Sequence, residues 1–223
     1  MTNIAIVLAG GFGARFGERK QFVDFVGKPV YMHVYEKAVI ALGRENVVVV
    51  GVDIPGGLTR SHSVINGLKH FKQKGKKYNK VLIMEAARPL VTIEQIRSLI
   101  DANAPSVTFV QPLVNTIIKK DVEFVNRNDY FELLTPQCFD FELLYKAYSE
   151  KSDWDMTDET RVIYEKYKIK PKFIEGGQNL TKLTYIKDLP YLEHLFRLQQ
   201  EGVFNENKNI NNRREWQYSN CAR

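Results

Sequence analysis

The chain has 223 residues, of which 44% are hydrophobic and 26% charged, the balance of a globular protein with one sizeable core. No apolar run approaches the roughly 20 residues that cross a bilayer, and no signal peptide opens the sequence, so we expect a cytoplasmic protein without a membrane partner. The net charge of +6 is concentrated around residues 72–80 and in the C-terminal tail, with no nucleic-acid-binding motif, which argues against a nucleic-acid partner and suits a small anionic substrate.

Short apolar runs rich in β-forming residues alternate with helical patterns along the chain. The runs are residues 4–8, 46–52, 80–84, 106–110 and 171–175. Continuous apolar strands separated by helices predict a mostly parallel sheet that is covered on both faces. The predicted fold class is therefore α/β, doubly wound and Rossmann-like, with one domain over residues 1–204 and a polar tail over 205–223.

Two of the predicted helices have clear end signals. Residues 30–42 repeat apolar side chains at helical spacing and stop before Gly43. A second helix is predicted to begin after Thr92, because Thr-Ile-Glu-Gln fits a capping box. We interpret both apolar stripes as core.

The stretch LAGGFGARFGERK, residues 8–20, joins the first strand to glycines and then to cations. Glycines allow a positive φ and let a ligand approach bare backbone N–H groups. Phe16 stands where a dinucleotide-binding fingerprint would need its third glycine, and no P-loop pattern is present. Arg15 and Lys20 are spaced to reach a triphosphate, so the stretch predicts a phosphate-binding loop. The alternative is a plain joint between a strand and a helix.

Two further stretches lie where a ligand of an open α/β sheet would bind. In residues 56–68, either Ser63 caps a core helix, or the Gly57 backbone and the Ser63 hydroxyl contact the edge of a base. In residues 81–91, Glu85 and Arg88 follow the carboxyl end of a predicted strand, and the small Ala86 leaves room for a ligand.

The second half of the chain contains a change of pattern. Residues 113–135 are strand-like at each end and polar at the centre, which predicts a β-arm that leaves the sheet and could pair with a second subunit. Cys138 and Cys221 lie far apart and outside any metal-binding spacing, so we expect free thiols. The tail from residue 205 is predicted to be loose or a helical extension.

Six motifs in order identify a family resemblance over residues 3–198. They are LAGGFGARFG…KQF, GGLTRSHSVINGL, MEAARPL, LLTPQCF, MTDET and KLTYIKDL. In this order they resemble the cytidylyltransferases that act on 2-C-methyl-D-erythritol 4-phosphate or D-ribitol 5-phosphate. The resemblance implies transfer of CMP from CTP to a small polyol phosphate, release of pyrophosphate, a need for Mg²⁺ and a homodimer formed through residues 113–135.

The resemblance also implies a role for individual residues. It assigns catalysis to Arg15, Lys20 and Lys182, nucleotide binding to Ala9, Gly10, Gly11, Gly57, Ser63 and Ala86, and polyol phosphate binding to Glu85, Thr116, Arg127 and Thr135. The Mg²⁺ ion would be held by the CTP phosphates, with Glu85 as a candidate ligand. Arg127 and Thr116 would be supplied by the partner subunit.

The sequence departs from the family pattern in three places. One is Asn179, which stands one residue further from Lys182 than the family's asparagine does, so we assign Lys182 and not Asn179. Glu85 stands where the family has aspartate, and residues 51–57 join the second strand to the glycine pair without the usual extra helix and strand. A parallel crossover needs a dozen or more residues, so that unit is expected to be missing or rerouted. Two alternatives therefore stay open: transfer of another nucleotide to a sugar phosphate, and a non-catalytic nucleotide-binding homologue.

Overall fold

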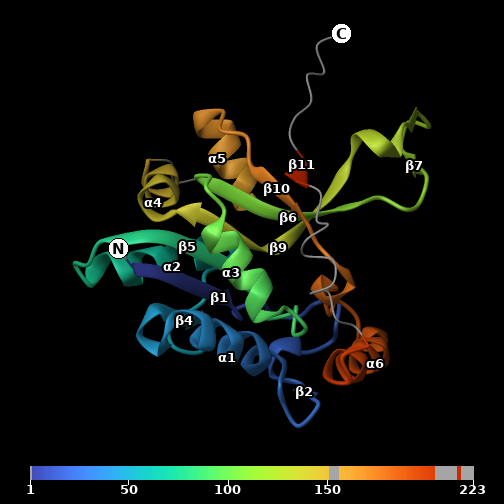
Figure 1. The fold of residues 1–223 in the computed structure, drawn as a ribbon, viewed down its shortest axis with the longest axis horizontal. Coiled ribbons are helices and arrows are strands. Elements are labelled where there is room, and N and C mark those ends of the chain that lie inside the picture. The colour runs from blue at the N-terminus through green and yellow to red at the C-terminus, as the bar shows by residue number, and fades with distance from the viewer. Residues whose placement is uncertain (1, 151–155, 204–214, 217–223) are drawn as a thin grey trace.

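Residues 2–150, 156–203 and 215–216 are described by a computed structural model, and they are built around a seven-stranded sheet (Figure 1). From one edge to the other, the strand order is β11, β10, β6, β9, β5, β1 and β4. Their bounds are β1 Thr2–Leu8, β4 Val47–Val50, β5 Tyr78–Glu85, β6 Ser106–Pro112, β9 Phe131–Asp140, β10 Lys172–Glu175 and β11 Glu215–Trp216. The pairings of β1 with β4 and β5, and of β6 with β10, are parallel. The predicted mostly parallel sheet is therefore present, with β9 antiparallel between β5 and β6.

Helices cover both faces of this sheet. Their bounds are α1 Val30–Leu42, α2 Arg60–Gln73, α3 Ile93–Asp101, α4 Phe141–Ser149, α5 Glu159–Tyr167 and α6 Leu189–Gln200. Ala5 and Val7 of β1 share one core with α1 and α3, while Ile4 and Ile6 share the other with α2, α4 and α5. Successive residues of a strand point to opposite faces, so a strand buried on both sides must be apolar throughout. The doubly wound fold class is confirmed. Within the described residues, no helix combines the length and the apolar character that a membrane crossing requires.

The ends of two helices follow the predicted signals. Helix α1 stops at Gly43, which has a φ of 87°. The N-cap of α3 is Thr92, whose hydroxyl accepts a hydrogen bond from the backbone N–H of Gln95 at 3.1 Å. The Gln95 side chain accepts one in return from the backbone N–H of Thr92 at 3.0 Å. Both predictions from local sequence are confirmed, because caps depend on residues only a few positions apart.

The connection from β4 to α2 is short, as the sequence predicts. Residues 51–59 lead directly from β4 into α2, so no extra helix or strand separates them and β4 forms one edge of the sheet. The Asp53 carboxylate accepts a hydrogen bond from the backbone N–H of Val49 at 2.8 Å. This contact occupies a donor that would otherwise be open on an edge strand.

The predicted arm is present but shorter than predicted. Strands β7 Ile117–Ile118 and β8 Phe124–Val125 pair antiparallel and extend away from the main sheet (Figure 1). Residues 131–135, by contrast, belong to β9 and pair with β6. The boundary at 135 is therefore wrong. Pro136 obscures the strand in the sequence, and it is tolerated because it lies where the register with β6 shifts, between Thr108 and Phe109.

Most of the predicted tail, residues 205–214 and 217–223, lies outside the described residues. Within it, Glu215–Trp216 form β11, which pairs antiparallel with β10 at the edge of the sheet. The expectation of a loose or helical tail is wrong for these two residues, because they complete a backbone ladder with an open edge strand. The remaining short elements are the hairpin of β2 Asp24–Phe25 and β3 Lys28–Pro29.

Candidate functional site

A cavity of about 380 Å³ opens where β1 and β5 end and α2 begins. Ligands of open α/β sheets bind at this carboxyl edge of the strands. Ten of the residues that the sequence assigns to the site line the cavity. They are Ala9, Gly10, Gly11, Arg15, Lys20, Gly57, Ser63, Glu85, Ala86 and Lys182.

A buried glutamine holds the glycine-rich loop against the sheet. The side-chain amide of Gln21 donates hydrogen bonds to the backbone oxygens of Ala9 at 2.7 Å and Gly11 at 2.8 Å. The backbone N–H of Ala9 is also occupied, since it donates to Val50 O at 2.8 Å. A side chain at Gly13, where φ is +70°, would place its Cβ 1.7 Å from the backbone oxygen of Glu18. The loop conformation therefore depends on Gln21 and on glycine at position 13. Sequence reasoning gave Gln21 no role, although it stands inside the KQF motif.

The three cations that the sequence assigns to catalysis come from two segments of the chain and meet in the cavity. Arg15 and Lys20 follow the glycine-rich loop, while Lys182 arrives from the segment before α6. The ammonium group of Lys20 donates to the backbone oxygen of Leu183 at 2.6 Å, which ties the two segments together. Burial lowers the pKa of Lys20 to about 8, and the neighbouring charges of Lys182 and Arg15 act in the same direction. The cavity is therefore prepared for an anion.

A small apolar cluster fixes the direction of two of these cations. Phe16 and Leu183 are buried in a core beside α6, where they pack with Phe25, Leu90 and Leu192. Each stands one residue after a cation of the cavity. Because adjacent side chains in extended or turn segments point to different sides, burying Phe16 and Leu183 turns their neighbours outward into the cavity. Phe16, which breaks the dinucleotide fingerprint, thus has a packing role.

The opposite wall of the cavity is the start of α2. The Ser63 hydroxyl accepts a hydrogen bond from the backbone N–H of Gly57 at 3.0 Å and approaches the backbone oxygen of Thr59 at 3.2 Å. The N-cap of α2 is Thr59, so the interpretation of Ser63 as the cap is wrong. A side chain at Gly57 would place its Cβ 2.2 Å from the Cβ of His62, so only glycine fits there. This wall presents mainly backbone groups to a ligand.

Glu85 lies between cations at the end of β5. Its Oε2 atom is 2.6 Å from the ammonium nitrogen of Lys182, and its Oε1 atom accepts a hydrogen bond from Nε of Arg60 at 3.3 Å. Nε of Arg88 is 4.0 Å from Oε2. Burial acts to raise the pKa of Glu85, but the charges of Lys182, Arg60 and Arg88 outweigh it and hold that pKa at about 2. The carboxylate is therefore charged at neutral pH.

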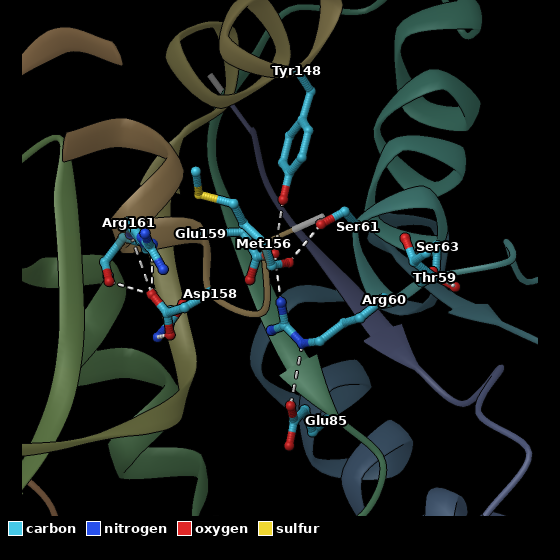
Figure 2. A network of polar contacts seen from close by, with 12 residues as sticks. Thr59, Arg60, Ser61, Ser63, Glu85, Tyr148, Met156, Asp158, Glu159 and Arg161 are labelled. Carbon is cyan, nitrogen blue, oxygen red and sulfur yellow. Dashed lines mark hydrogen bonds and ion pairs between the residues drawn. The ribbon is translucent and has the colours of Figure 1, made fainter. Parts of the chain in front are cut away.

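Arg60 also contacts a second carboxylate, which sequence reasoning did not assign to the site. Figure 2 shows the Arg60 side chain between Glu85 and Glu159. Arg60 stands inside the motif GGLTRSHSVINGL, and Glu159 inside MTDET. Since 99 positions separate them in the chain, no local pattern could have paired them.

Three residues assigned to the polyol phosphate lie away from the cavity lining in this single chain. Thr116 and Arg127 belong to the exposed arm, where the Arg127 guanidinium donates to the backbone oxygen of Val114. Thr135 is buried in β9, and its hydroxyl accepts a hydrogen bond from Nε of Arg88 at 2.8 Å. The chain by itself therefore brings together the nucleotide half of the predicted site and leaves most of the acceptor half elsewhere.

The cavity suits a metal ion that arrives with its phosphates. Glu85 is the only carboxylate in the cavity lining, and no cluster of three or more metal-ligating side chains occurs in the described part of the chain. Mg²⁺ commonly binds through one or two carboxylates, several waters and the phosphates of a substrate. The donor set therefore fits Mg²⁺ bound to a triphosphate, and does not form a protein cage for the ion.

Comparison with known proteins points to one family. The family model described as 2-C-methyl-D-erythritol 4-phosphate cytidylyltransferase matches residues 35–197. An enzyme of that name from Bacteroides fragilis is 33% identical over 218 residues, which is 85% of this chain and 97% of the relative. Another from Thermotoga neapolitana is 31% identical over 213 residues, or 84% and 93% of the two chains. A D-ribitol-5-phosphate cytidylyltransferase from Xenopus tropicalis is 27% identical over 238 residues, which is 88% of this chain and 57% of the relative.

Solved structures support the same fold. The bifunctional IspDF of Campylobacter jejuni is 25% identical, with a TM-score of 0.74 over 86% of this chain and 54% of the other. A 4-diphosphocytidyl-2C-methyl-D-erythritol synthase from Anaerococcus prevotii is 21% identical, with a TM-score of 0.71 over 88% and 96%. The chain thus spans about half of the bifunctional protein and nearly all of the other.

Proposed function

The chain belongs to the 2-C-methyl-D-erythritol 4-phosphate cytidylyltransferase family, and from this premise we propose that it transfers CMP from CTP to a small polyol phosphate and releases pyrophosphate. The observation that carries the proposal is the meeting of Arg15, Lys20 and Lys182 in one cavity at the carboxyl edge of the sheet. Cations in such a site stabilise the charge that develops on a transferring phosphoryl group and on its leaving group.

In the proposed reaction, a phosphate oxygen of the acceptor attacks the α-phosphorus of CTP. A bond forms between these two atoms, and the bond from the α-phosphorus to the oxygen shared with the β-phosphate breaks. Pyrophosphate leaves with the electron pair of that bond. We assign the triphosphate to Arg15 and Lys20, and the α-phosphate also to Lys182. The attacking oxygen is already anionic, so the protein needs to position two anions and requires no strong general base.

We assign the cytosine base to the wall formed by the glycine-rich loop and the start of α2. Gly10, Gly11 and Gly57 supply backbone groups there, and Ser63 and Ala86 line the adjoining surface. The Ala9 carbonyl already accepts one hydrogen bond from Gln21 and has a second lone pair for the base. Its N–H group is used by Val50. Contact through Ala9 is therefore proposed for its oxygen alone.

We assign the acceptor phosphate to Glu85 and Thr135 of one chain together with Thr116 and Arg127 from the arm of a second copy. Support comes from the exposed apolar side chains of the arm, where Val114 is 80% and Phe124 69% exposed. Large exposed apolar side chains gathered on one element mark an interaction surface. The guanidinium fork of Arg127 suits a phosphate because it can donate two parallel hydrogen bonds. The proposed assembly is a homodimer.

A mixing experiment tests whether the arm acts across subunits. At low acceptor concentration, Lys20→Ala is expected to be nearly inactive and Arg127→Ala to keep about 10–20% of wild-type turnover. A hybrid dimer has one intact site if the arm crosses to its partner, so equal mixing should restore about a quarter of wild-type turnover. Mixing a protein with a second sample of itself is the control. Failure of the hybrid to exceed the two parents would place the arm with its own cavity.

We propose that Mg²⁺ binds through the CTP phosphates, with Glu85, the carboxylate in the cavity lining, as a candidate ligand. The ion supplies charge neutralisation on the phosphates. Chelation with EDTA should abolish turnover and excess Mg²⁺ should restore it. Unchanged turnover in EDTA would remove the ion from the proposal. A cytoplasmic location stays a prediction from the sequence.

Acceptor identity is tested by pyrophosphate release from CTP and Mg²⁺ with 2-C-methyl-D-erythritol 4-phosphate or D-ribitol 5-phosphate. The relatives at 31% and 33% identity carry the methylerythritol name, so turnover is expected first with that acceptor. UTP, GTP and ATP serve as controls for the nucleotide. No release with either acceptor, even where CTP raises the melting temperature, would contradict the proposed reaction.

A further inference from the structure

Arg60 stands between two carboxylates, one on each side of the cavity wall. It is the first residue of α2, directly after the segment 57–59 that we assign to the base. Nη1 of Arg60 donates to Oε1 of Glu159 at 2.6 Å, and Nε donates to Oε1 of Glu85 at 3.3 Å. The proposed reaction assigns no role to Arg60, although its guanidinium group binds both carboxylates (Figure 2).

The contact behind Arg60 is fully buried. Glu159 opens α5 and has no exposed surface, and its Oε1 atom also accepts a hydrogen bond from the hydroxyl of Tyr148 at 3.0 Å. A buried carboxylate is costly unless a cation and hydrogen bonds compensate it. Burial alone would lower the pKa of Arg60, and the charge of Glu159 overrides this and raises that pKa. Glu159 thus compensates the burial of Arg60, which is always a cation.

The second contact of Arg60, with Glu85, connects it to Lys182, which we assign to the reaction. Arg60 takes Oε1 of Glu85, and Lys182 takes Oε2 at 2.6 Å. Oε1 therefore faces Arg60, while Oε2 faces Lys182 at close range and Arg88 at 4.0 Å. The Lys182 side chain remains about one third exposed, on the side that lines the cavity. Two cations that share one carboxylate each hold it less strongly than one cation alone would.

We propose that Arg60 is a positioning residue that acts on Lys182 through Glu85. Because Arg60 shares the charge of Glu85, this carboxylate orients Lys182 but binds it weakly enough that Lys182 can still contact an anionic substrate. Glu159, which also binds Tyr148, competes with Glu85 for Arg60 and so sets the strength of the ion pair between Arg60 and Glu85. The inference deepens the proposed function and rests on it for the phosphate that Lys182 contacts.

The charges make a prediction of opposite sign for two variants. Glu159→Gln can keep both hydrogen bonds, because Oε1 carries both and Oε2 has no hydrogen-bond donor among the described residues. This variant removes only the charge of Glu159. The ion pair of Arg60 with Glu85 should then become stronger, and that of Lys182 with Glu85 weaker. Removing Arg60 does the reverse, and Lys182 becomes bound more tightly by Glu85.

The measurement is competitive acetylation of ligand-free protein by acetic anhydride, with mass spectrometry of the Lys182 peptide against that of the exposed Lys76. Lys182 should react about threefold faster in Glu159→Gln and about threefold slower in Arg60→Met. Arg60→Met alone leaves Glu159 buried without a cation and can unfold the chain. The double variant Arg60→Met/Glu159→Gln avoids this and should also react more slowly than wild type.

A matched control removes the charge of a different carboxylate, which lies on α4 and also pairs with a cation of α2. Glu142→Gln breaks the exposed pair of Glu142 with Lys72, which also lies on α2, and should leave Lys182 labelling unchanged. If Glu159→Gln and the double variant move the labelling rate in the same direction, or if neither moves it, the inference is overturned. General loosening of the fold would give the first of these results, so a purely structural role is distinguished.

Kinetics provide a second test that depends on the proposed function. The double variant should lower kcat about tenfold while the KM for CTP changes less than about threefold, because Lys182 acts on the transferring phosphate. In a Lys182→Ala background the same two changes should alter kcat less than about twofold. Additive losses would overturn the inference. If wild type shows no turnover at all, the proposed function fails, and the labelling experiment still decides the role of Arg60.

Discussion

The cavity beside β1 and β5 and the arm at residues 113–130 carry the two groups of residues that we assign to the substrates, and they differ in burial and in support. Lys20 is tied to Leu183, and the cavity loop is held by the buried Gln21. On the arm, the Arg127 guanidinium donates to the nearby backbone oxygen of Val114, and Phe124 is 69% exposed. The nucleotide half is thus preorganised within one chain, while the acceptor half depends on what covers the arm.

The largest expected effect is at the preorganised half. Lys20→Ala should lower turnover about 100-fold or more, because it removes a cation that stabilises the leaving pyrophosphate. Lys37→Ala is the matched control, since Lys37 is also a half-buried lysine that donates to a backbone oxygen, that of Pro89 at 2.8 Å, but outside the cavity lining. It should lower the melting temperature and keep turnover. Near-normal pyrophosphate release by Lys20→Ala would remove Lys20 from the site.

The same residue gives a pH dependence. With the pKa of Lys20 at about 8, kcat/KM for CTP should fall roughly tenfold per pH unit above that value as the ammonium loses its proton. Lys20→Arg keeps its charge, so this decline should be absent, whatever its plateau rate. An alkaline limb shared by both proteins would assign the titration to another group.

Raising the pH above about 8 should change stability and activity in opposite directions. Lys20 has a pKa of about 8 in the folded chain against 10.5 as a free side chain, so the unfolded chain binds more protons between these values. The Lys20 contribution to the free energy of unfolding should therefore rise with pH across this window. Urea unfolding of wild type and Lys20→Met at pH 7.5 and 10 measures the difference, and a larger gain in Lys20→Met than in wild type would contradict it.

At the arm, the effect should be smaller and confined to one substrate. Arg127→Ala should raise the KM for the polyol phosphate five- to tenfold and change the KM for CTP less than about twofold. Lys119→Ala, which removes another exposed cation of the arm, is the control. A rise in the KM for CTP alone would mean that the arm binds the nucleotide, which would contradict its assignment to the acceptor.

The smallest effect tests how the cavity loop is held. Gln21→Leu should cost about 1–3 kcal/mol of stability, because it leaves the buried backbone oxygen of Ala9 and the partly buried one of Gly11 without their donor. The KM for CTP should rise about threefold as the loop loses its preorganisation. Gln111→Leu, at an exposed glutamine of β6, should change neither quantity. Equal effects of the two variants in thermal unfolding and initial-rate assays would deny Gln21 its role.

The sequence predicted those parts of the fold that depend on neighbouring residues. The strand at residues 4–8, the glycines after it and the capping box at Thr92 are all local features, and the structure contains each of them. Strand β9 escaped prediction, because Pro136 and Gln137 interrupt its apolar pattern. Its place between β5 and β6 depends on pairing with residues 19 to 60 positions away in the chain.

By itself, the sequence determined the α/β class, the glycine-rich turn after the first strand and the family. Apolar periodicity and turn chemistry act over a few residues, so they can be recognised without a fold. Only the tertiary structure decided that Arg60 meets Glu159, that Gln21 holds the loop and that Thr135 is buried against Arg88. Pairing of charges and hydrogen bonds inside a protein depends on which distant segments pack together, and the cost of burying an unpaired polar group then selects the partners.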